Sequence, residues 1–357
     1  MNDNVVMRFS AKPVTYHFNG SLSQLAGVTD QQRTVIVTDR HLMTAHAASF
    51  EGWKTIVLEP GEEHKVQSTV DDIIRRLIEW QVDRSFTLVG VGGGVVTDIT
   101  GYAASVYMRG LRFGFVPSSL LAMVDASIGG KNGIDVGPYK NMVGVIRQPS
   151  FLLYDFDLLE TLPETEWSNG FAEIIKHACI KDLTAFRLLE RHDLETLRRN
   201  PDTLRSLIRR NALLKSRVVR RDEFEKGERR LLNFGHTLGH ALETSYVLSH
   251  GQAVALGMIA ACKISEAQTG FKDTAKVTKV LSQFGLPVQG SFDPDRIMSV
   301  LRMDKKRVSQ SMNYILLERI GRGLVQSIPL DDLEAKIRML SASGPLLDPI
   351  DASNRDQ

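Results

Sequence analysis

The first part of the chain alternates short segments rich in β-branched residues with stretches of helical spacing. Four of these segments have the length and apolar character of strands that are buried on both faces. They lie at residues 34–38, 54–58, 85–89 and 113–116, and residues 70–81 have the spacing of an amphipathic helix. Strands that alternate with helices predict an α/β domain with a mostly parallel, Rossmann-like sheet.

From about residue 161 the strand signals become rare and helical periodicity dominates. Helices are predicted over residues 183–198, 201–219, 236–246 and 253–269, and one further strand-like segment occurs at 312–317. We therefore predict an α/β domain over 1–160 and a mainly α-helical domain over 161–345, with the active site in the cleft between them. Residues 346–357 are rich in Pro, Asp, Ser and Asn, and we expect a disordered tail there.

A glycine-rich turn follows the third predicted strand. The run Gly92-Gly93-Gly94 precedes a predicted helix over 95–108, an arrangement that lets the backbone approach a pyrophosphate at a helix N-terminus. The match to the dinucleotide fingerprint is imperfect, because Val95 stands where the last glycine is expected. A tight turn without a ligand stays open as the alternative. Asp98, one turn into the helix, could stabilise the helix start or contact a ribose.

A second glycine-rich segment, residues 127–133, surrounds Lys131 with three glycines. Backbone amides and a point charge in this arrangement can wrap an anion, although the segment taken alone favours a glycine-rich hairpin with a solvated lysine. Arg109, Lys140 and Asn141 lie nearby in sequence and add cationic and donor groups. Together these residues indicate a phosphorylated or carboxylated substrate.

Three of the nine histidines of the chain fall within residues 236–250. His236 and His240 stand at i and i+4 and share one helical face, and His250 can fold back toward them after a short bend. Imidazole is the commonest ligand of zinc-type metals, and a catalytic site needs three protein ligands and one open position. The cluster therefore predicts a catalytic metal site.

A carboxylate is needed to complete such a site, and two candidates are available. Glu173 lies on one helical face with Lys176 and His177, where the lysine could stabilise a developing anion. Glu243 lies seven residues after His236 and is nearly as well placed. Spacing alone does not decide between the two carboxylates, nor whether His240 binds the metal or the substrate.

Composition narrows the class of protein. Of the 357 residues, 43% are hydrophobic and 24% charged, and the formal net charge of +2 gives no general reason to expect nucleic acid as a partner. The two cysteines, Cys179 and Cys262, lie in apolar segments and fit a reducing compartment. The N-terminal segment does not have the pattern of a secretory signal, and the longest apolar run, 253–262, is too short to cross a bilayer. We expect a cytoplasmic protein without a membrane partner.

Five separate motifs occur in the order and spacing of one known family. They are Gly-Gly-Gly-Val-Val-Thr-Asp at 92–98, Asp-Ala-Ser-Ile-Gly-Gly-Lys at 125–131, Ala-Glu-Ile-Ile-Lys at 172–176, Leu-Asn-Phe-Gly-His-Thr at 232–237 and His-Gly-Gln-Ala-Val at 250–254. Together they resemble the 3-dehydroquinate synthases of the sugar-phosphate cyclase superfamily. The likeness runs from about residue 38 to about residue 306, which is most of the chain.

The resemblance implies a lyase of the shikimate pathway that uses NAD and Zn²⁺, for which Co²⁺ can substitute. Its substrate would be a small phosphorylated keto-acid sugar, 3-deoxy-D-arabino-heptulosonate 7-phosphate. Transient oxidation by NAD acidifies a neighbouring C–H bond, phosphate leaves by β-elimination, the hydride returns, and an intramolecular aldol closure forms 3-dehydroquinate. NAD is regenerated in every cycle. A homodimer is also implied, because Arg109 matches an arginine that reaches the phosphate site of the neighbouring subunit.

By motif position, the resemblance also assigns roles to individual residues. The metal ligands would be Glu173, His236 and His250. The catalytic and substrate-binding set would be Lys131, Asn141, Lys176, Lys215, Arg229, Asn233, His240, Arg109 and one of the pair Lys305 and Lys306, for which we take Lys305. The cofactor-binding set would be Asp39, Glu62, Lys65, Gly93, Gly94, Asp98, Ser118, Ser119, Asp125, Lys140 and Thr161, with Asp125 near the nicotinamide.

The chain departs from the family pattern at a few positions. Thr97 replaces a glycine, Ser118 and Ser119 replace threonines, Asn132 replaces a threonine, and Gln252 replaces a glutamate. We expect the loss of charge at Gln252 to alter how His250 is oriented. The alternatives to the main interpretation are a valiolone-type or inosose-type cyclase, a metal-dependent polyol dehydrogenase and a non-catalytic binding protein.

Overall fold

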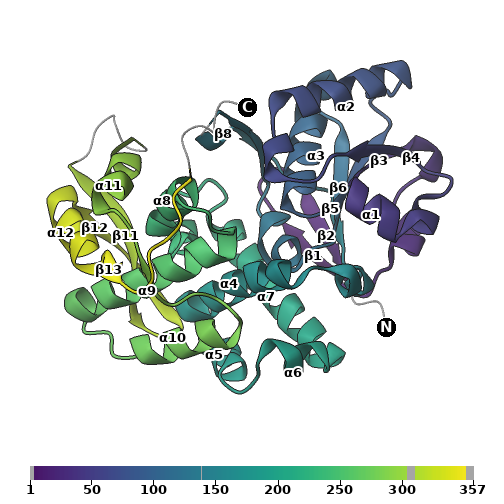
Figure 1. Ribbon diagram of the computed structural model, residues 1–357. Coiled ribbons are helices and arrows are strands. Elements are labelled where there is room, and N and C mark those ends of the chain that lie inside the picture. Colours follow the sequence, from purple (N-terminus) through teal and green to yellow (C-terminus); the bar gives the residue numbers. More distant parts are fainter. Residues whose placement is uncertain (1–3, 138, 304–309, 351–357) are drawn as a thin grey trace. The chain divides into compact units, whose positions relative to one another are not determined.

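The structure is a computed structural model that describes residues 4–137, 139–303 and 310–350 (Figure 1). The chain forms two compact units: unit 1 comprises Met1–Trp167 and Ile208–Phe224, and unit 2 comprises Ser168–Leu207 and Glu225–Gln357. These units differ from a single division near residue 160, because the second half of helix α7 (Pro201–Arg221) packs with the N-terminal residues. Within unit 1, Ser216 Oγ donates a hydrogen bond to Tyr16 OH at 2.8 Å.

Unit 1 contains a seven-stranded sheet in the order β1-β2-β9-β6-β5-β3-β4. Only the β1–β2 pair is antiparallel, which confirms the predicted mostly parallel sheet. The strands are β1 (Asn4–Arg8), β2 (Pro13–His17), β3 (Thr34–Asp39), β4 (Lys54–Leu58), β5 (Thr87–Gly92), β6 (Arg112–Pro117) and β9 (Phe151–Leu153). Besides the residues of α7, this unit contains the helices α1 (Arg40–Ala45), α2 (Gln67–Glu79) and α3 (Gly94–Val106), which lie against the sheet in Figure 1.

The order of the strands places a topological switch point at the carboxyl ends of β3 and β5. The chain runs from β3 outward to β4 and then returns to β5 on the other side of β3. Ligands of parallel α/β sheets bind where the direction of winding reverses in this way. Every residue of β5 is buried and all but the last of β3, so the apolar interior holds both strands firmly at this point.

Strands β7 (Lys131–Val136) and β8 (Tyr139–Ile146) form a separate antiparallel hairpin. The glycine-rich segment at 127–133 therefore leads into a hairpin, which was one of its two interpretations. The hairpin packs on α3 at Gly101, where a Cβ would come within 2.0 Å of Asn132 Oδ1. Asn132 Nδ2 donates to the carbonyl oxygens of Gly130 and Arg147, so the amide that replaces the family threonine has a structural function.

Unit 2 is mainly helical, as predicted. Its helices are the greater part of α4 (Glu164–Lys181), then α5 (Leu183–Leu189), α6 (Leu194–Arg198), the start of α7, α8 (His236–Ser245), α9 (His250–Thr269), α10 (Thr274–Gln283), α11 (Pro294–Met303) and α12 (Leu330–Leu340). The prediction of one helix over 183–198 was wrong. Asp193 accepts a hydrogen bond from Thr196 N and begins a new helix, α6.

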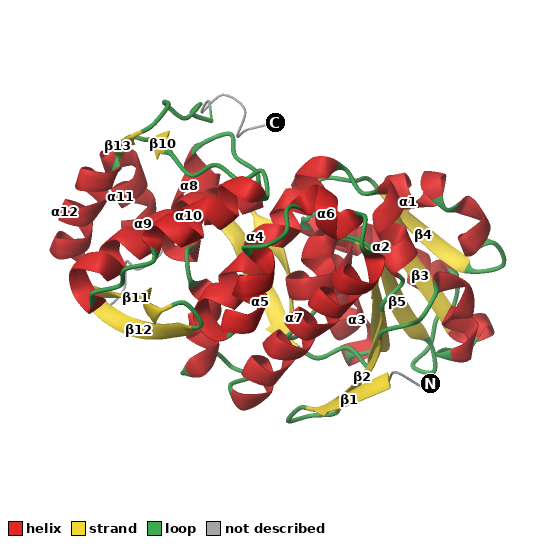
Figure 2. Cartoon of the chain, turned by 90° about the horizontal axis from the view of Figure 1, so that it is seen from below, coloured by secondary structure: helices red, strands yellow, loops and turns green. Residues whose placement is uncertain are grey.

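Two short sheets complete unit 2. Strands β11 (Ser311–Arg319) and β12 (Arg322–Pro329) pair antiparallel beside α9, and β10 (Gly290–Ser291) pairs with β13 (Ala342–Ser343). Figure 2 shows the β11–β12 pair beneath the helices of this unit. Of the expected tail 346–357, residues up to 350 are paired, for example through Ile350 N to Ser245 O at 3.0 Å, and 351–357 lie outside the described residues.

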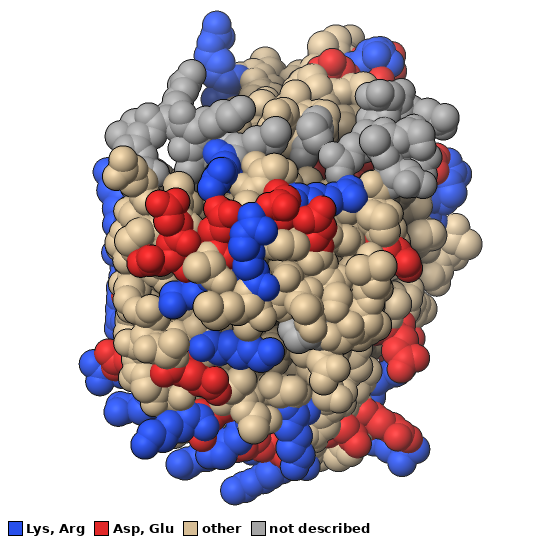
Figure 3. Space-filling model, turned by 60° about the vertical axis from the view of Figure 1, so that its left-hand side comes forward, with Lys and Arg blue, Asp and Glu red and all other residues tan. Residues whose placement is uncertain are grey.

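The surface carries charge of both signs. On the face drawn in Figure 3, basic and acidic side chains are interspersed, so neither sign dominates it. Among the described residues, no helix combines the length and the apolar character needed to cross a membrane.

Candidate active site

Three helices of unit 2 bring together the predicted metal ligands. Glu173 comes from the middle of α4, and His236 and His250 are the first residues of α8 and α9. One ligand atom from each residue lies within 4.8 Å of the other two. Glu173 Oε1 is 3.4 Å from His236 Nε2 and 3.2 Å from His250 Nε2. The three donors therefore converge on one point, as a metal with two imidazole ligands and one carboxylate ligand requires.

Glycines allow α8 and α9 to approach closely enough for this convergence. Gly235 has a left-handed backbone (φ +79°) immediately before His236, and a Cβ at Gly257 would lie 1.9 Å from the carbonyl oxygen of Gly235. A Cβ at Gly239 would lie 3.1 Å from Ala253 O. Larger residues at these positions would push apart the two helices that carry the imidazoles.

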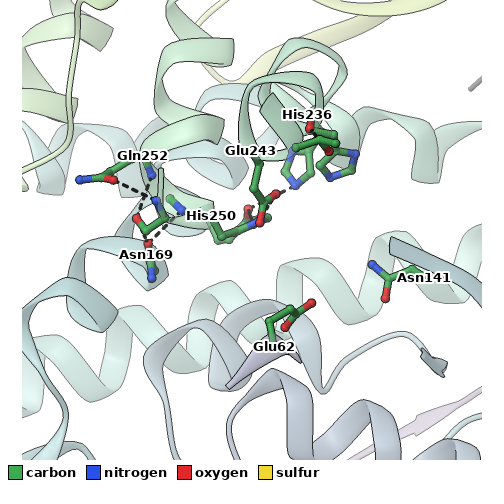
Figure 4. A network of polar contacts seen from close by, with 12 residues as sticks. Glu62, Asn141, Asn169, His236, Glu243, His250 and Gln252 are labelled. Carbon is green, nitrogen blue, oxygen red and sulfur yellow. Dashed lines mark hydrogen bonds and ion pairs between the residues drawn. The ribbon is translucent and has the colours of Figure 1, made fainter. Parts of the chain in front are cut away.

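The first turn of α9 is fixed by two further interactions (Figure 4). Asn169 Oδ1, on α4, accepts hydrogen bonds from Ser249 Oγ at 2.7 Å and from Gly251 N at 2.9 Å. Ser249 and Gln252 form a capping box, in which Gln252 Oε1 accepts from Ser249 N at 2.9 Å. The side chain of Gln252 thus caps the helix, and this explains why α9 begins at His250 and not at residue 253 as predicted.

The outer nitrogen of each imidazole also has a partner. His236 Nδ1 lies 3.2 Å from the carbonyl oxygen of Phe234, and His250 Nδ1 lies 3.5 Å from Glu243 Oε2. Burial alone would lower the pKa of His250, but its contacts with Glu173 and Glu243 raise it to about 10. Glu173 faces both Nε2 atoms and Glu243 faces only one Nδ1, so the geometry favours Glu173 as the ligand carboxylate.

Negative charge at the centre of this cluster is strongly stabilised. Burial opposes ionisation of Glu173, but Lys176 and His236 and the hydrogen bonds from both histidines outweigh it and hold the pKa of Glu173 well below its usual range. Lys176 Nζ contacts Glu173 Oε2 directly, and both side chains are buried. A charged carboxylate beside two imidazoles suits a dication.

The remaining predicted residues of unit 2 lie on the segment before α8 and on α8. Arg229 is buried in the turn Glu228–Asn233, and Asn233 Nδ2 donates to Glu225 Oε1 at 2.6 Å. The ring of His240 is exposed and its centroid lies 5.1 Å from that of His236. Neither Asn169 nor Glu225 could be predicted from the sequence, because their contacts join segments distant in sequence or depend on a turn. Lys305 and Lys306 lie outside the described residues.

In unit 1, several predicted cofactor residues gather at the carboxyl ends of the parallel strands. Asp39 ends β3 and caps α1 by accepting from Leu42 N at 2.9 Å. Gly93 is the N-cap of α3 and has no side chain to occupy the amide groups of the first turn. Ser118 and Ser119 follow β6 and are buried, and a Cβ at Gly93 would lie 3.6 Å from Ser119 Oγ. Gly94 begins α3 directly after β5, and the N-terminus of a helix is a position that favours an anion.

A buried lysine links three more of the predicted residues. Lys65 Nζ lies 2.8 Å from Asp98 Oδ2, 2.8 Å from Asn141 Oδ1 and 3.7 Å from Glu62 Oε1. Burial raises the pKa of Asp98 to about 6, although Lys65 acts in the opposite direction. Lys140, next to Asn141, is exposed on β8. The prediction grouped Asn141 with the substrate residues, and the structure places it beside the cofactor candidates Lys65 and Asp98.

Other predicted residues of unit 1 are more dispersed. Lys215 Nζ lies 2.8 Å from Asp125 Oδ1, and Thr161 Oγ1 lies 3.3 Å from His46 Nε2. Lys131 is exposed at the start of β7. Arg109 is exposed and has a left-handed backbone (φ +64°), a strained conformation that is often associated with function.

Known structures share this fold. A 2-epi-5-epi-valiolone synthase from Streptomyces hygroscopicus, solved with NAD⁺ and Zn²⁺, is 27% identical with a TM-score of 0.84, covering 94% of this chain and 98% of that one. A 2-deoxy-scyllo-inosose synthase, solved with carbaglucose-6-phosphate, NAD⁺ and Co²⁺, is 25% identical with a TM-score of 0.82, covering 94% and 99%. A butanol dehydrogenase from Thermotoga maritima at 16% identity has the same fold, with a TM-score of 0.65. The fold is therefore that of these sugar-phosphate cyclases.

Sequence relatives identify the family within this class. The N-terminal and C-terminal family models of 3-dehydroquinate synthase match residues 55–169 and 170–307. A 3-dehydroquinate synthase from Pyrococcus abyssi is 41% identical over 77% of this chain and 81% of its own length, and one from Nitrosospira multiformis is 38% identical over 84% and 85%. The chain belongs to the 3-dehydroquinate synthase family, whose members are phosphate-eliminating lyases that use NAD and a metal. The resemblance seen in the sequence is confirmed.

Proposed function

We propose that this enzyme converts 3-deoxy-D-arabino-heptulosonate 7-phosphate to 3-dehydroquinate and phosphate in the cytoplasm, as a step of the shikimate pathway. The observation that carries the proposal is the convergence of Glu173, His236 and His250 within 4.8 Å. A family match over most of the chain supports the choice of reaction.

Glu173, His236 and His250 would hold the metal, and the carboxyl ends of β3 and β5 together with the start of α3 would hold NAD. The donor set of two imidazoles and one buried carboxylate suits Zn²⁺, and Co²⁺ as a substitute. When bound, the metal supplies Lewis-acid polarisation of a substrate hydroxyl, and NAD supplies a hydride acceptor that returns the hydride within the same turnover.

The cationic residues would bind the two anionic groups of the substrate. Lys176 keeps a buried positive charge beside the ligand carboxylate, where an oxyanion can be stabilised. Arg229 is also buried, and a carboxylate-bearing substrate would offset its charge better than a neutral one. Exposed His240, close to His236, is suited to move protons. The full substrate set in this proposal is Lys131, Asn141, Lys176, Lys215, Arg229, Asn233, His240, Arg109 and Lys305.

We further propose that two copies of the chain form a homodimer in which Arg109 of one copy serves the phosphate site of the other. The strained backbone of Arg109 and its exposed side chain support a functional position. In the cytoplasm the buried thiols Cys179 and Cys262 would remain reduced, in keeping with their state as free cysteines.

The test is an assay of inorganic phosphate release with Zn²⁺ and NAD present, in which absorbance also follows NADH. We expect phosphate release from the heptulosonate phosphate without net NADH, and much slower release from sedoheptulose 7-phosphate, which lacks the carboxylate. Steady NADH accumulation without phosphate would overturn the proposal in favour of a polyol dehydrogenase. A preference for sedoheptulose 7-phosphate would favour a valiolone-type cyclase.

The ligand assignment has its own test, which is the metal content of purified variants. Glu173→Ala and His236→Ala should lose bound metal, and His240→Ala should retain it, because His240 does not belong to the group of converging donors. Equal loss in all three variants would refute the assignment.

A further inference from the structure

The two candidate histidine ligands differ in what holds their outer nitrogen. His236 Nδ1 faces a neutral group, the carbonyl oxygen of Phe234, at 3.2 Å. His250 Nδ1 faces a carboxylate oxygen of Glu243 at 3.5 Å. The imidazole of His250 thus lies between two carboxylates, with Glu173 at Nε2 and Glu243 at Nδ1.

We propose that Glu243 is a positioning residue for His250: its carboxylate holds the proton on Nδ1, so that the lone pair of Nε2 is directed at the metal. This inference rests on the proposed function, in which Glu173, His236 and His250 bind the metal. A histidine ligand must keep one nitrogen free of protons, and a hydrogen bond at the other nitrogen selects that tautomer and the angle of the ring.

The position of Glu243 in the fold suits this role. Glu243 lies seven residues after His236 on the same helix, α8, and so on the same face of that helix. One helix therefore supplies a ligand directly and supports the second ligand, which is carried by α9. The side chain of Glu243 is only 12% exposed, so bulk water competes weakly for its carboxylate.

The balance of charge also favours a second carboxylate here. Lys176 already offsets the charge of Glu173, and both side chains are buried. A bound dication would then leave an excess of positive charge in a buried cluster, which is costly. Glu243 reduces this excess without occupying a coordination position, because Glu173 already lies at Nε2.

The test compares the full-length wild-type protein with Glu243→Ala, Glu243→Gln and Glu173→Gln, and with Glu266→Gln as a control for loss of a surface carboxylate on α9. The Zn²⁺ affinity of each is measured by competition with a chromophoric chelator, and the visible spectrum of each Co²⁺-loaded protein is recorded. Thermal unfolding of the metal-free proteins shows whether each variant folds.

We expect Glu243→Ala to weaken Zn²⁺ binding by about 10-fold to 100-fold and to change the Co²⁺ spectrum, because carboxylates behind a histidine ligand have effects of that size. Glu243→Gln retains an acceptor for the Nδ1 proton but has no charge, so its Zn²⁺ affinity should fall less than that of Glu243→Ala. Glu173→Gln should weaken Zn²⁺ binding more than either Glu243 variant does. Glu266→Gln should have the Zn²⁺ affinity and the Co²⁺ spectrum of the wild type.

Two results would overturn the inference. In the first, Glu243→Ala has an unchanged Zn²⁺ affinity and Co²⁺ spectrum, while Glu173→Gln loses much of its Zn²⁺ affinity. Glu243 would then only stabilise the fold, and the proposed metal site would stand. A loss in Glu243→Ala as large as that in Glu173→Gln would make Glu243 a ligand itself. If Glu173→Gln also retained its metal, the proposed site would fail and this inference with it.

Discussion

Asn169 Oδ1 on α4 accepts a hydrogen bond at 2.9 Å from the backbone amide of Gly251, the residue that follows the metal-ligand candidate His250. Glu173 lies one turn further along the same helix. A single helix therefore supplies the carboxylate ligand and fixes the start of the helix that carries an imidazole ligand. The close approach depends on glycine, because a Cβ at Gly251 would lie 2.6 Å from Asn169 Cα.

Replacement of Asn169 should weaken both stability and metal binding. Asn169→Ala leaves the buried amide of Gly251 and the hydroxyl of Ser249 without this acceptor, and we expect the free energy of unfolding to fall by about 1–3 kcal/mol. Urea unfolding of the metal-free protein measures the loss of stability, and competition with a chelator measures the loss of metal affinity. The exposed Gln268→Ala on α9 is the control. A wild-type unfolding free energy and metal affinity in Asn169→Ala would show that the contacts of Asn169 do not support the metal site.

Gly257 should not tolerate a methyl group. In Gly257→Ala the new Cβ would meet the carbonyl oxygen of Gly235 at 1.9 Å, and a backbone atom cannot move away cheaply. We expect a loss of about 1–3 kcal/mol in unfolding free energy, the usual cost of overpacking. Gly27→Ala is the matched control, because nothing lies within 4 Å of its Cβ. Equal melting temperatures for the two variants would disprove the close contact between α8 and α9.

Lys65→Met should destabilise unit 1 and weaken NAD binding. The substitution removes the cation that faces Asp98 at 2.8 Å, and breaking a largely buried ion pair costs about 3 kcal/mol or more. The double variant Lys65→Met, Asp98→Asn should recover much of the stability, because no unpaired charge remains. Chemical unfolding measures stability and calorimetric titration measures NAD affinity. A double variant as unstable as the single one would mean that the pair is not coupled.

Lys12 should make stability depend on pH in the alkaline range. Burial and repulsion by Arg147 and Arg112 lower its pKa from 10.5 to about 8. Between these two values the folded protein binds fewer protons than the unfolded chain, so its stability should rise as the pH rises. In Lys12→Met this rise should be smaller, while Lys54→Met, which removes an exposed lysine, should behave like the wild type. The free energy of unfolding in urea is compared at about pH 7.5 and about pH 10, near the two ends of this range. Equal changes in this free energy in all three proteins would exclude a contribution from Lys12.

Arg109 should act across a subunit boundary. Arg109→Ala and Lys176→Ala should each be nearly inactive as homodimers, since both residues belong to the proposed substrate site. Mixed dimers of the two variants contain one site with both residues intact, so mixing after partial unfolding should restore up to about half of the activity per dimer. Phosphate release is the measure. If mixed dimers form but the phosphate-releasing activity does not recover, Arg109 would belong to the site of its own chain.

Strands β3, β4, β5 and β6 and the metal-ligand candidates could be predicted from the sequence because their signals are local, whereas β1, β2 and β9 were not predicted. Short runs of β-branched residues such as 34–38 favour buried strands, and His236, Glu173 and His250 lie in motifs of a known family. Helix boundaries were less certain. The break at Asp193 and the start of α9 at His250 depend on caps that compete with a continuous helical pattern.

The amino-acid sequence by itself determined the class of fold, the family and the set of ionisable residues, because hydrophobic spacing and motif chemistry are encoded in neighbouring residues. Only the tertiary structure decided that Asn169 secures the start of α9, that Gln252 caps that helix, and that Glu243 lies behind an imidazole. These contacts join groups up to 82 residues apart, or depend on where a helix begins, and only the packing of the helices sets such distances.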